Sequence, residues 1–216
     1  MLNIPFLIFR PNKVMKYIFF DIDGTLHKED AFKAFIRYLI GKRWGNLVIF
    51  FPFILVGFLL HKMLPTGKFG INLVFFFLGI GSSLQKRGEY AEEFSSTFTY
   101  HPFPDVVAKF SEYLNKGYHV VLISGSPKIL IQHIYKEWLE HDNVTLIASE
   151  LSLADFKLHS RCMAHHKLEM LDEHFQRAIY FEAGYSDSLS DLPVLTRCKF
   201  SFKVTEQGKI EPISIL

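Results

Sequence analysis

The sequence predicts an α/β fold with a mainly parallel, Rossmann-like sheet that is covered by helices. Two observations favour it. Short apolar runs alternate with helical segments from residue 100 onward. Acidic or hydroxyl side chains directly follow several of these runs. The 216 residues suffice for one such domain and a smaller insertion. We therefore expect a core formed by 15–30 and 100–216, a helical cap over 31–99 and an N-terminal extension over 1–14.

The first strand is expected at 16–20, an apolar run that ends in an acidic, glycine-containing loop. A helix is expected over 29–40, where five apolar side chains share one face. Proline and glycine bound the next helix, at 104–116. The remaining expected elements are strands over 118–123, 144–148, 178–181 and 200–204, helices over 128–141 and 166–175, and a small hairpin over 151–163.

Two apolar stretches interrupt this alternation after the first strand. Residues 44–60 and 69–85 each hold 17 residues without a charge, and a turn-forming link joins them. They predict a hairpin of two apolar helices over 44–85. Its helices are at the lower limit of length for crossing a bilayer, so a short transmembrane hairpin and a hairpin lying in one leaflet both remain open. The alternative is a pair of buried helices in a soluble cap.

Charge is distributed unevenly along the chain. The net charge is +2, but residues 1–87 carry 12 basic and 4 acidic residues, and 31–87 carry eight basic residues and no acidic one. A basic, phenylalanine-rich stretch is typical of contact with an anionic membrane surface, and no nucleic-acid partner is expected. Basic pairs flank both ends of the hairpin and predict that both ends lie on the cytoplasmic side. The two cysteines, Cys162 and Cys198, fit a reducing compartment.

The chemistry begins with two carboxylates, Asp21 and Asp23, at the end of the first strand. Like charges this close repel each other unless a cation lies between them, and Mg²⁺ accepts one or two carboxylates together with phosphate oxygens. Gly24 permits a tight turn whose N–H groups can bind an anion. The alternative is an ordinary Asp-Gly turn with exposed acids.

Three weaker signals follow in order. Ser124 ends a predicted strand before a helix, a typical phosphate site as well as a typical helix cap. Lys167 can neutralise a phosphate or be an ordinary surface lysine. Asp187 and Asp191 lie in a serine-rich loop that can complete a magnesium site or form a polar turn. The adjacent His165 and His166 are expected to face different directions, which argues against a shared metal.

Together, the segments that hold these residues resemble the four motifs of the haloacid-dehalogenase-like hydrolase superfamily. The resemblance implies that Asp21 is the nucleophile that becomes phosphorylated and that Asp23 is the general acid and base. It implies that Mg²⁺ is bound by Asp21, Asp187 and the backbone carbonyl of Asp23, with support from Asp191. The implied phosphate-binding residues are Thr25, Ser124, Gly125 and Lys167. The apolar insertion stands where this superfamily places a C1-type cap.

A closer resemblance is to the phosphatidylglycerophosphatase C family, through FFDIDGTLHKEDAFKAFIRYL, LISGSPKILIQHIY, VTLIASE, RCMAHHK and GYSDSLSDLPVL. It implies removal of the terminal phosphate of phosphatidylglycerophosphate at a bacterial inner membrane, with the catalytic domain on the cytoplasmic side. A second phosphate of this substrate is a candidate ligand for Arg161, His165 and His166. Two alternatives stay open: a phosphatase of a soluble phosphomonoester, and a non-catalytic membrane-associated module. The sequence does not indicate an oligomeric state.

Overall fold

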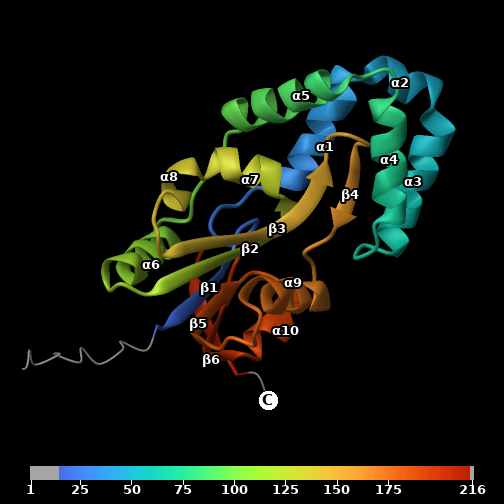
Figure 1. The fold of residues 1–216 in the computed structure, drawn as a ribbon. Coiled ribbons are helices and arrows are strands. Elements are labelled where there is room, and N and C mark those ends of the chain that lie inside the picture. Colours follow the sequence, from blue (N-terminus) through green and yellow to red (C-terminus); the bar gives the residue numbers. More distant parts are fainter. Residues whose placement is uncertain (1–14, 215–216) are drawn as a thin grey trace, which may run out of the picture.

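The computed structural model describes residues 15–214, so the predicted extension over 1–14 lies outside the described residues (Figure 1). A seven-stranded sheet has the order β4-β3-β2-β1-β5-β6-β7, and its five central strands are parallel. The edge strands β4 and β7 are antiparallel to their neighbours. This arrangement confirms the predicted α/β class. The strands are β1 (Tyr17–Asp21), β2 (His119–Pro127), β3 (Val144–Ser152), β4 (Lys157–Ser160), β5 (Phe181–Ser186), β6 (Cys198–Val204) and β7 (Ile210–Ile213).

Successive side chains of the central strands alternate between two helical layers, which buries both faces of the sheet. Phe19 and Val121 pack in one apolar cluster with residues of α9 (His165–Phe175) and α10 (Leu192–Leu195). Phe20 and Leu122 pack in the other with residues of α6 (Pro104–Asn115) and α7 (Lys128–Ile134). The strand ends are thereby held at one edge of a rigid sheet.

Six helices lie between β1 and β2, and the first five of them are at one end of the sheet beside β4 (Figure 1). The helix predicted over 29–40 is α1, which begins after Asp30, whose carboxylate accepts a hydrogen bond from Lys33 N at 2.8 Å. We call this segment the helical insertion; its helices are α1 (Ala31–Lys42), α2 (Trp44–Ile49), α3 (Phe51–Met63), α4 (Phe69–Gly79) and α5 (Leu84–Thr97).

The apolar hairpin is present, but its predicted helix bounds are wrong. The first helix breaks at Phe50, before Pro52 at the start of α3. The second ends at Gly79, because Gly81 adopts a φ of 76° and Ser83 caps a separate helix, α5. Within the described residues, no single helix is both long enough and apolar enough to span a membrane. Taken together, α4 and α5 reach the required length and apolar character, but a bend of 109° separates them.

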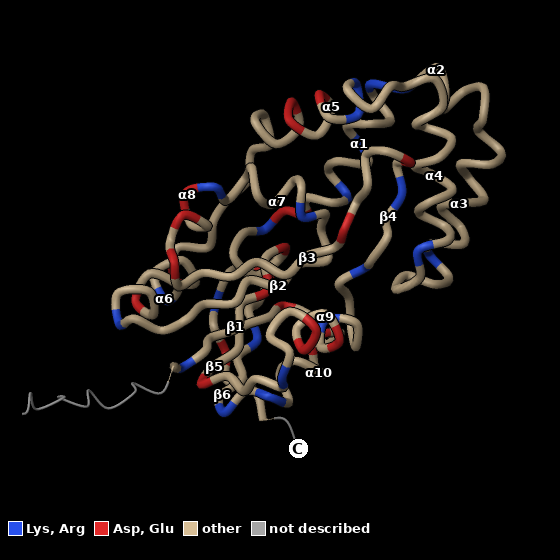
Figure 2. The backbone as a smooth tube through the Cα atoms, in the orientation of Figure 1, with Lys and Arg blue, Asp and Glu red and all other residues tan. Residues whose placement is uncertain are grey.

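The two hairpin helices differ in exposure. The apolar side of α4 is buried in one cluster with α1 and β4 residues. In contrast, α3 buries only Ile54 and Gly57. Thirteen of the eighteen large apolar side chains that are exposed among the described residues lie between Trp44 and Leu84. In Figure 2 the tube over α3 and α4 carries almost no charge except near their connecting loop. The alternative of two buried helices therefore does not hold for α3.

Several other predicted elements differ in the structure. The strand predicted at 178–181 is β5, which runs from Phe181 to Ser186 because β1 and β6 pair with it on both sides. The helix predicted over 128–141 is interrupted at Tyr135 and continues as the short α8 (Lys136–Leu139). Strand β7 was not predicted at all. The hairpin expected over 151–163 is the turn that joins β3 and β4, with β4 covering 157–160.

Candidate active site

The predicted acidic residues meet at the edge of the sheet where the parallel strands end. Asp21 ends β1, Ser124 lies near the end of β2 and Asp187 directly follows β5. A cleft of about 540 Å³ opens here between the sheet edge and the helical insertion, and its size is typical of a small-molecule site. Its polar lining consists of Asp21, Asp23, Asp30, Lys33, Arg37, His61, Ser126, Arg161, Lys167, Asp187, Ser188, Ser190 and Asp191.

A buried group of three charges forms the floor of this cleft. Lys167 Nζ lies 2.6 Å from Asp21 Oδ1 and 2.6 Å from Asp191 Oδ2, and all three side chains are less than one tenth exposed. Lys167 comes from the first turn of α9, so the α9 helix delivers the ammonium group to the end of β1. Ser186 Oγ donates a further hydrogen bond to Asp191 Oδ2 at 2.8 Å.

Asp187 is held beside Asp21 by the turn that follows β1. Thr25 Oγ1 donates to Asp187 Oδ1 at 3.1 Å and accepts a hydrogen bond from Asp187 N at 2.9 Å. Gly24 has a φ of 80°, and a Cβ atom there would lie 2.5 Å from Asp187 Oδ2. Thr25 itself is fully buried and outside the lining of the cleft. In this arrangement the Thr25 hydroxyl supports Asp187, and its contact with phosphate stays a prediction.

Asp23 points into a second hydrogen-bond network in the same cleft. Its Oδ2 accepts hydrogen bonds from Ser124 Oγ at 2.8 Å and Ser126 Oγ at 2.7 Å, and its Oδ1 accepts one from Ala31 N at 2.7 Å. The Ser124 hydroxyl is therefore engaged with Asp23, while Gly125 and Ser126 line the cleft. The phosphate contacts of Ser124 and Gly125 stay predictions.

The carboxylates carry an excess of negative charge that suits a divalent cation. Burial raises the pKa of Asp21 well above its ordinary value, and the nearby Asp191 and Asp187 carboxylates act in the same direction against the opposing effect of Lys167. Burial also raises the pKa of Asp187. Asp191 Oδ1 is buried and has no hydrogen-bond partner among residues 15–214. Asp21 and Asp191 share one ammonium group and Asp187 lies near them, so the site fits Mg²⁺, which prefers oxygen ligands.

Two residues of the cleft were missed or only partly anticipated. Ser126 holds Asp23 as closely as Ser124 does, and the Ser-Gly-Ser sequence at the end of β2 was the available signal. Arg161 was named only as a contact for a second phosphate; it proves to be 7% exposed and to line the cleft. His165 and His166 do not line the cleft.

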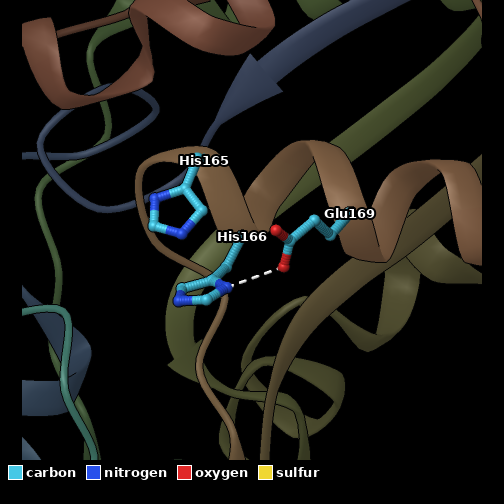
Figure 3. A group of neighbouring side chains, drawn as sticks. All are labelled: His165, His166 and Glu169. Atoms are coloured by element: carbon cyan, nitrogen blue, oxygen red, sulfur yellow. Dashed lines mark hydrogen bonds and ion pairs between the residues drawn. The ribbon is translucent and has the colours of Figure 1, made fainter.

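The expectation that the two histidines face different directions is wrong. Their ring centroids lie 4.0 Å apart, and His166 Nδ1 lies 2.8 Å from Glu169 Oε2 (Figure 3). Both belong to the first turn of α9, where an unusual backbone conformation at Ala164 (φ 50°) precedes the helix. The donor atoms of the two histidines and Glu169 lie within 4.8 Å of one another, close enough for one metal ion at the protein surface.

Comparison with known proteins agrees with this geometry. A family model for haloacid dehalogenase-like hydrolases matches residues 18–196. Protein CicA of Caulobacter vibrioides is 27% identical over 183 residues, which cover 82% of this chain and 80% of that protein.

Solved structures share the fold at low sequence identity. A protein of unknown function from Bordetella pertussis Tohama I has a TM-score of 0.58 and 16% identity, with 84% of this chain and 86% of that chain covered. A phosphoserine phosphatase solved as a phospho-aspartyl intermediate analogue has a TM-score of 0.52 and 16% identity, with 87% and 85% covered. The family model spans most of the chain, including every carboxylate described above, and this chain therefore belongs to the haloacid dehalogenase-like hydrolases.

Proposed function

We propose that this protein is a magnesium-dependent phosphatase that acts through an aspartyl-phosphate on Asp21 and removes the terminal phosphate of phosphatidylglycerophosphate. The observation that carries the proposal is the pair of carboxylates in one cleft. Asp21 is held by Lys167 at 2.6 Å, and Asp23 is held separately by two serine hydroxyls. Two acidic side chains in different environments can divide the work of nucleophile and acid.

Asp21 attacks the phosphorus atom, and the bond between phosphorus and the leaving alcohol breaks. Asp23 donates a proton to the leaving oxygen. Burial raises the pKa of Asp23, which favours the protonated form that this step requires. Asp23 then removes a proton from a water molecule that attacks the phosphorylated Asp21, so inorganic phosphate leaves and both side chains return to their starting state. Lys167 keeps Asp21 oriented throughout.

The residues that would hold Mg²⁺ are Asp21, Asp187 and the backbone carbonyl of Asp23, with Asp191 behind them. When bound, the ion supplies positive charge that offsets the negative charge of the phosphoryl group and of the carboxylates. The Thr25 hydroxyl keeps Asp187 at its place in this group. The unpartnered Asp191 Oδ1 and the raised pKa of Asp187 both support a cation at this position.

A lipid substrate is supported by the surface beside the cleft. Where α3 passes into α4, Met63, Leu64 and Phe69 are exposed by 76%, 66% and 73%, and the basic Lys62 and Lys68 are their neighbours in the sequence. Such a mixture favours insertion at the interface of an anionic membrane. Pro65, in the same connection, lines the cleft. We propose that this loop and the outward side of α3 lie in one leaflet of a bacterial inner membrane, with the catalytic cleft on the cytoplasmic side.

The substitution Asp21→Asn tests the catalytic part. Release of inorganic phosphate from phosphatidylglycerophosphate in magnesium-containing detergent micelles should stop, while the circular dichroism spectrum stays unchanged. Asp105→Asn, which changes an exposed carboxylate of α6, is the matched control and should remain active. Undiminished activity of the Asp21→Asn variant would remove Asp21 from the mechanism. Removal of divalent ions with a chelator should stop the wild-type reaction, and added Mg²⁺ should restore it.

Flotation with phosphatidylglycerol vesicles tests the membrane part. The double change of Leu64 and Phe69 to serine should leave the protein at the bottom of the gradient. Phe200→Ser, which alters a 51% exposed side chain on β6, should still float with the vesicles. If the wild-type protein stays at the bottom and hydrolyses a soluble phosphomonoester as fast as the lipid, the alternative of a soluble substrate holds.

A further inference from the structure

Arg161 stands out because its charge is buried in the cleft without a partner. The residue is 7% exposed, and its Nη1 atom has no hydrogen-bond partner in the described part of the chain. Its Nε donates only to the thioether sulfur of Met163, at 3.0 Å, which is a weak acceptor. No carboxylate of residues 15–214 lies within 4.0 Å of the guanidinium nitrogens. Burying an unpaired charge costs free energy unless something compensates it.

The surroundings hold this guanidinium in place instead of neutralising it. It lies over the ring of Phe32 on α1, 5.5 Å from the centroid. The next residue is anchored to the core, because Cys162 N donates to Ser149 Oγ at 2.9 Å and Ser149 Oγ donates to Gly125 O at 2.7 Å. Arg161 is therefore fixed on the same framework that presents Gly125 to the cleft, and a fixed guanidinium suits recognition of a phosphate group.

Further positive charge lines the same part of the cleft. Lys33, Arg37 and His61 come from α1 and α3 and face the cleft together with Arg161. Burial lowers the pKa of His61, and the charges of Arg161 and Lys33 lower it further, so the neutral form of His61 is favoured. Because Lys33 is paired with Asp30, the uncompensated positive charge of this part comes from Arg37 and Arg161. The one acidic residue of this part, Asp30, is already engaged by Lys33, through the backbone N–H and through Nζ at 2.8 Å. The cleft thus has an acidic part around Asp21 and a basic part around Arg161.

We propose that Arg161 binds a second anionic group of the substrate, a phosphodiester in the leaving alcohol, while the phosphomonoester is bound at Asp21. This inference rests on the proposed phosphatase function, and it makes Arg161 the residue that selects substrates with a phosphodiester. A guanidinium group offers two parallel N–H donors to the non-bridging oxygens of a phosphodiester, which a phosphomonoester without a second anionic group cannot use. Selectivity of this kind requires Arg161 but no contact with acyl chains.

The test compares two soluble substrates, glycerophosphoglycerol phosphate, which contains a phosphodiester, and glycerol phosphate, which does not. In the Arg161→Met variant, kcat/KM for the first should fall about 10- to 100-fold, the range for loss of charged hydrogen bonds, while that for the second changes little. Arg161→Lys should restore part of the preference. Arg177→Met, at an exposed arginine beyond the cleft, is the matched control. An equal loss on both substrates, or no loss, would overturn the proposal.

A binding measurement separates this inference from the proposed function. Glycerophosphoglycerol, which has the phosphodiester and no phosphomonoester, is titrated calorimetrically into Asp21→Asn and into Asp21→Asn with Arg161→Met. Binding that is lost with Arg161 supports the subsite even if neither substrate is hydrolysed, an outcome that would refute the phosphatase proposal alone. Hydrolysis of both substrates with binding that is independent of Arg161 would refute the subsite and leave the phosphatase proposal intact. Phosphatidylglycerophosphate and phosphatidic acid in micelles repeat the comparison with lipids.

Discussion

The substitution Lys167→Met tests the electrostatics of the site without relying on catalysis. It removes the ammonium group that lies 2.6 Å from both Asp21 and Asp191, and it leaves two buried carboxylates without their shared cation. At an effective dielectric constant of 20, each charge pair at this distance is worth roughly 6 kcal/mol before desolvation is subtracted. Breaking buried pairs of this kind costs about 3–5 kcal/mol net, so we expect the free energy of unfolding to fall by that amount at pH 8 without Mg²⁺.

The sign of the pH dependence follows from the carboxyl groups. Burial already raises the pKa of Asp21, and Lys167 opposes this rise, so the variant should raise that pKa further. The folded variant then binds protons that the unfolded chain releases, and its stability increases as the pH falls toward the ordinary carboxyl pKa of about 4. The deficit relative to the wild type should therefore be smaller at pH 5.5 than at pH 8.

Urea denaturation followed by tryptophan fluorescence, in the presence of a chelator, measures both quantities. Lys199→Met is the matched control, because it removes an exposed lysine from a surface pair with Glu182 and should change stability little. Mg²⁺ should restore part of the stability of Lys167→Met, since the cation replaces the lost positive charge. An unfolding free energy that equals that of the wild type at both pH values would refute the reasoning.

Three further predictions concern single positions. Gly24→Ala should lower the free energy of unfolding by about 1–2 kcal/mol, because of its positive φ, and should weaken Mg²⁺ binding in calorimetry, because its Cβ would collide with Asp187; unchanged Mg²⁺ affinity would contradict this. Gly70→Ala should cost about 1–3 kcal/mol in urea denaturation, because its Cβ would lie 2.7 Å from Gly57 O where α3 and α4 touch. Burial lowers the pKa of His27, so the unfolded chain binds its proton more readily and stability falls below pH 6.5. His27→Phe should remove up to about 1.4 kcal/mol of this loss per pH unit. If the free energy of unfolding of the variant falls with pH as steeply as that of the wild type, His27 is not the cause of the loss.

The sheet and the acidic group were predictable because their signals are local and agree with one another. Asp21 and Ser124 each follow an apolar run, and parallel strands bring such ends to one edge. Strand β5 was misplaced because Gly184 and Ser186 resemble turn residues. Gly184 is required in the strand for another reason, since its Cβ would lie 3.1 Å from the ring of Phe19. Close packing of this kind leaves no pattern in a single sequence.

The finer arrangement of the site depends on side-chain partners that spacing does not encode. Thr25 and Ser124 belong to motifs associated with phosphate, yet their hydroxyls are taken up by Asp187 and Asp23. The burial of Arg161 arises because α1 brings Phe32 over it, a contact across more than a hundred residues. The apolar hairpin was predicted by composition, but only the packing of α4 against α1 shows that α3 carries the exposed side.

Helix α3 forms a wall with two surfaces. Phe58 and His61 line the cleft, whereas Val56 and Leu59 are 47% and 53% exposed to the outside. Under the proposed docking through that outer surface and the proposed lipid substrate, a substrate molecule would reach the cleft by lateral diffusion within the leaflet and need not dissolve in water. Turnover then follows the mole fraction of substrate among the surrounding lipids, so diluting the bilayer with neutral lipid slows the reaction even when the total amount of substrate in the sample is constant.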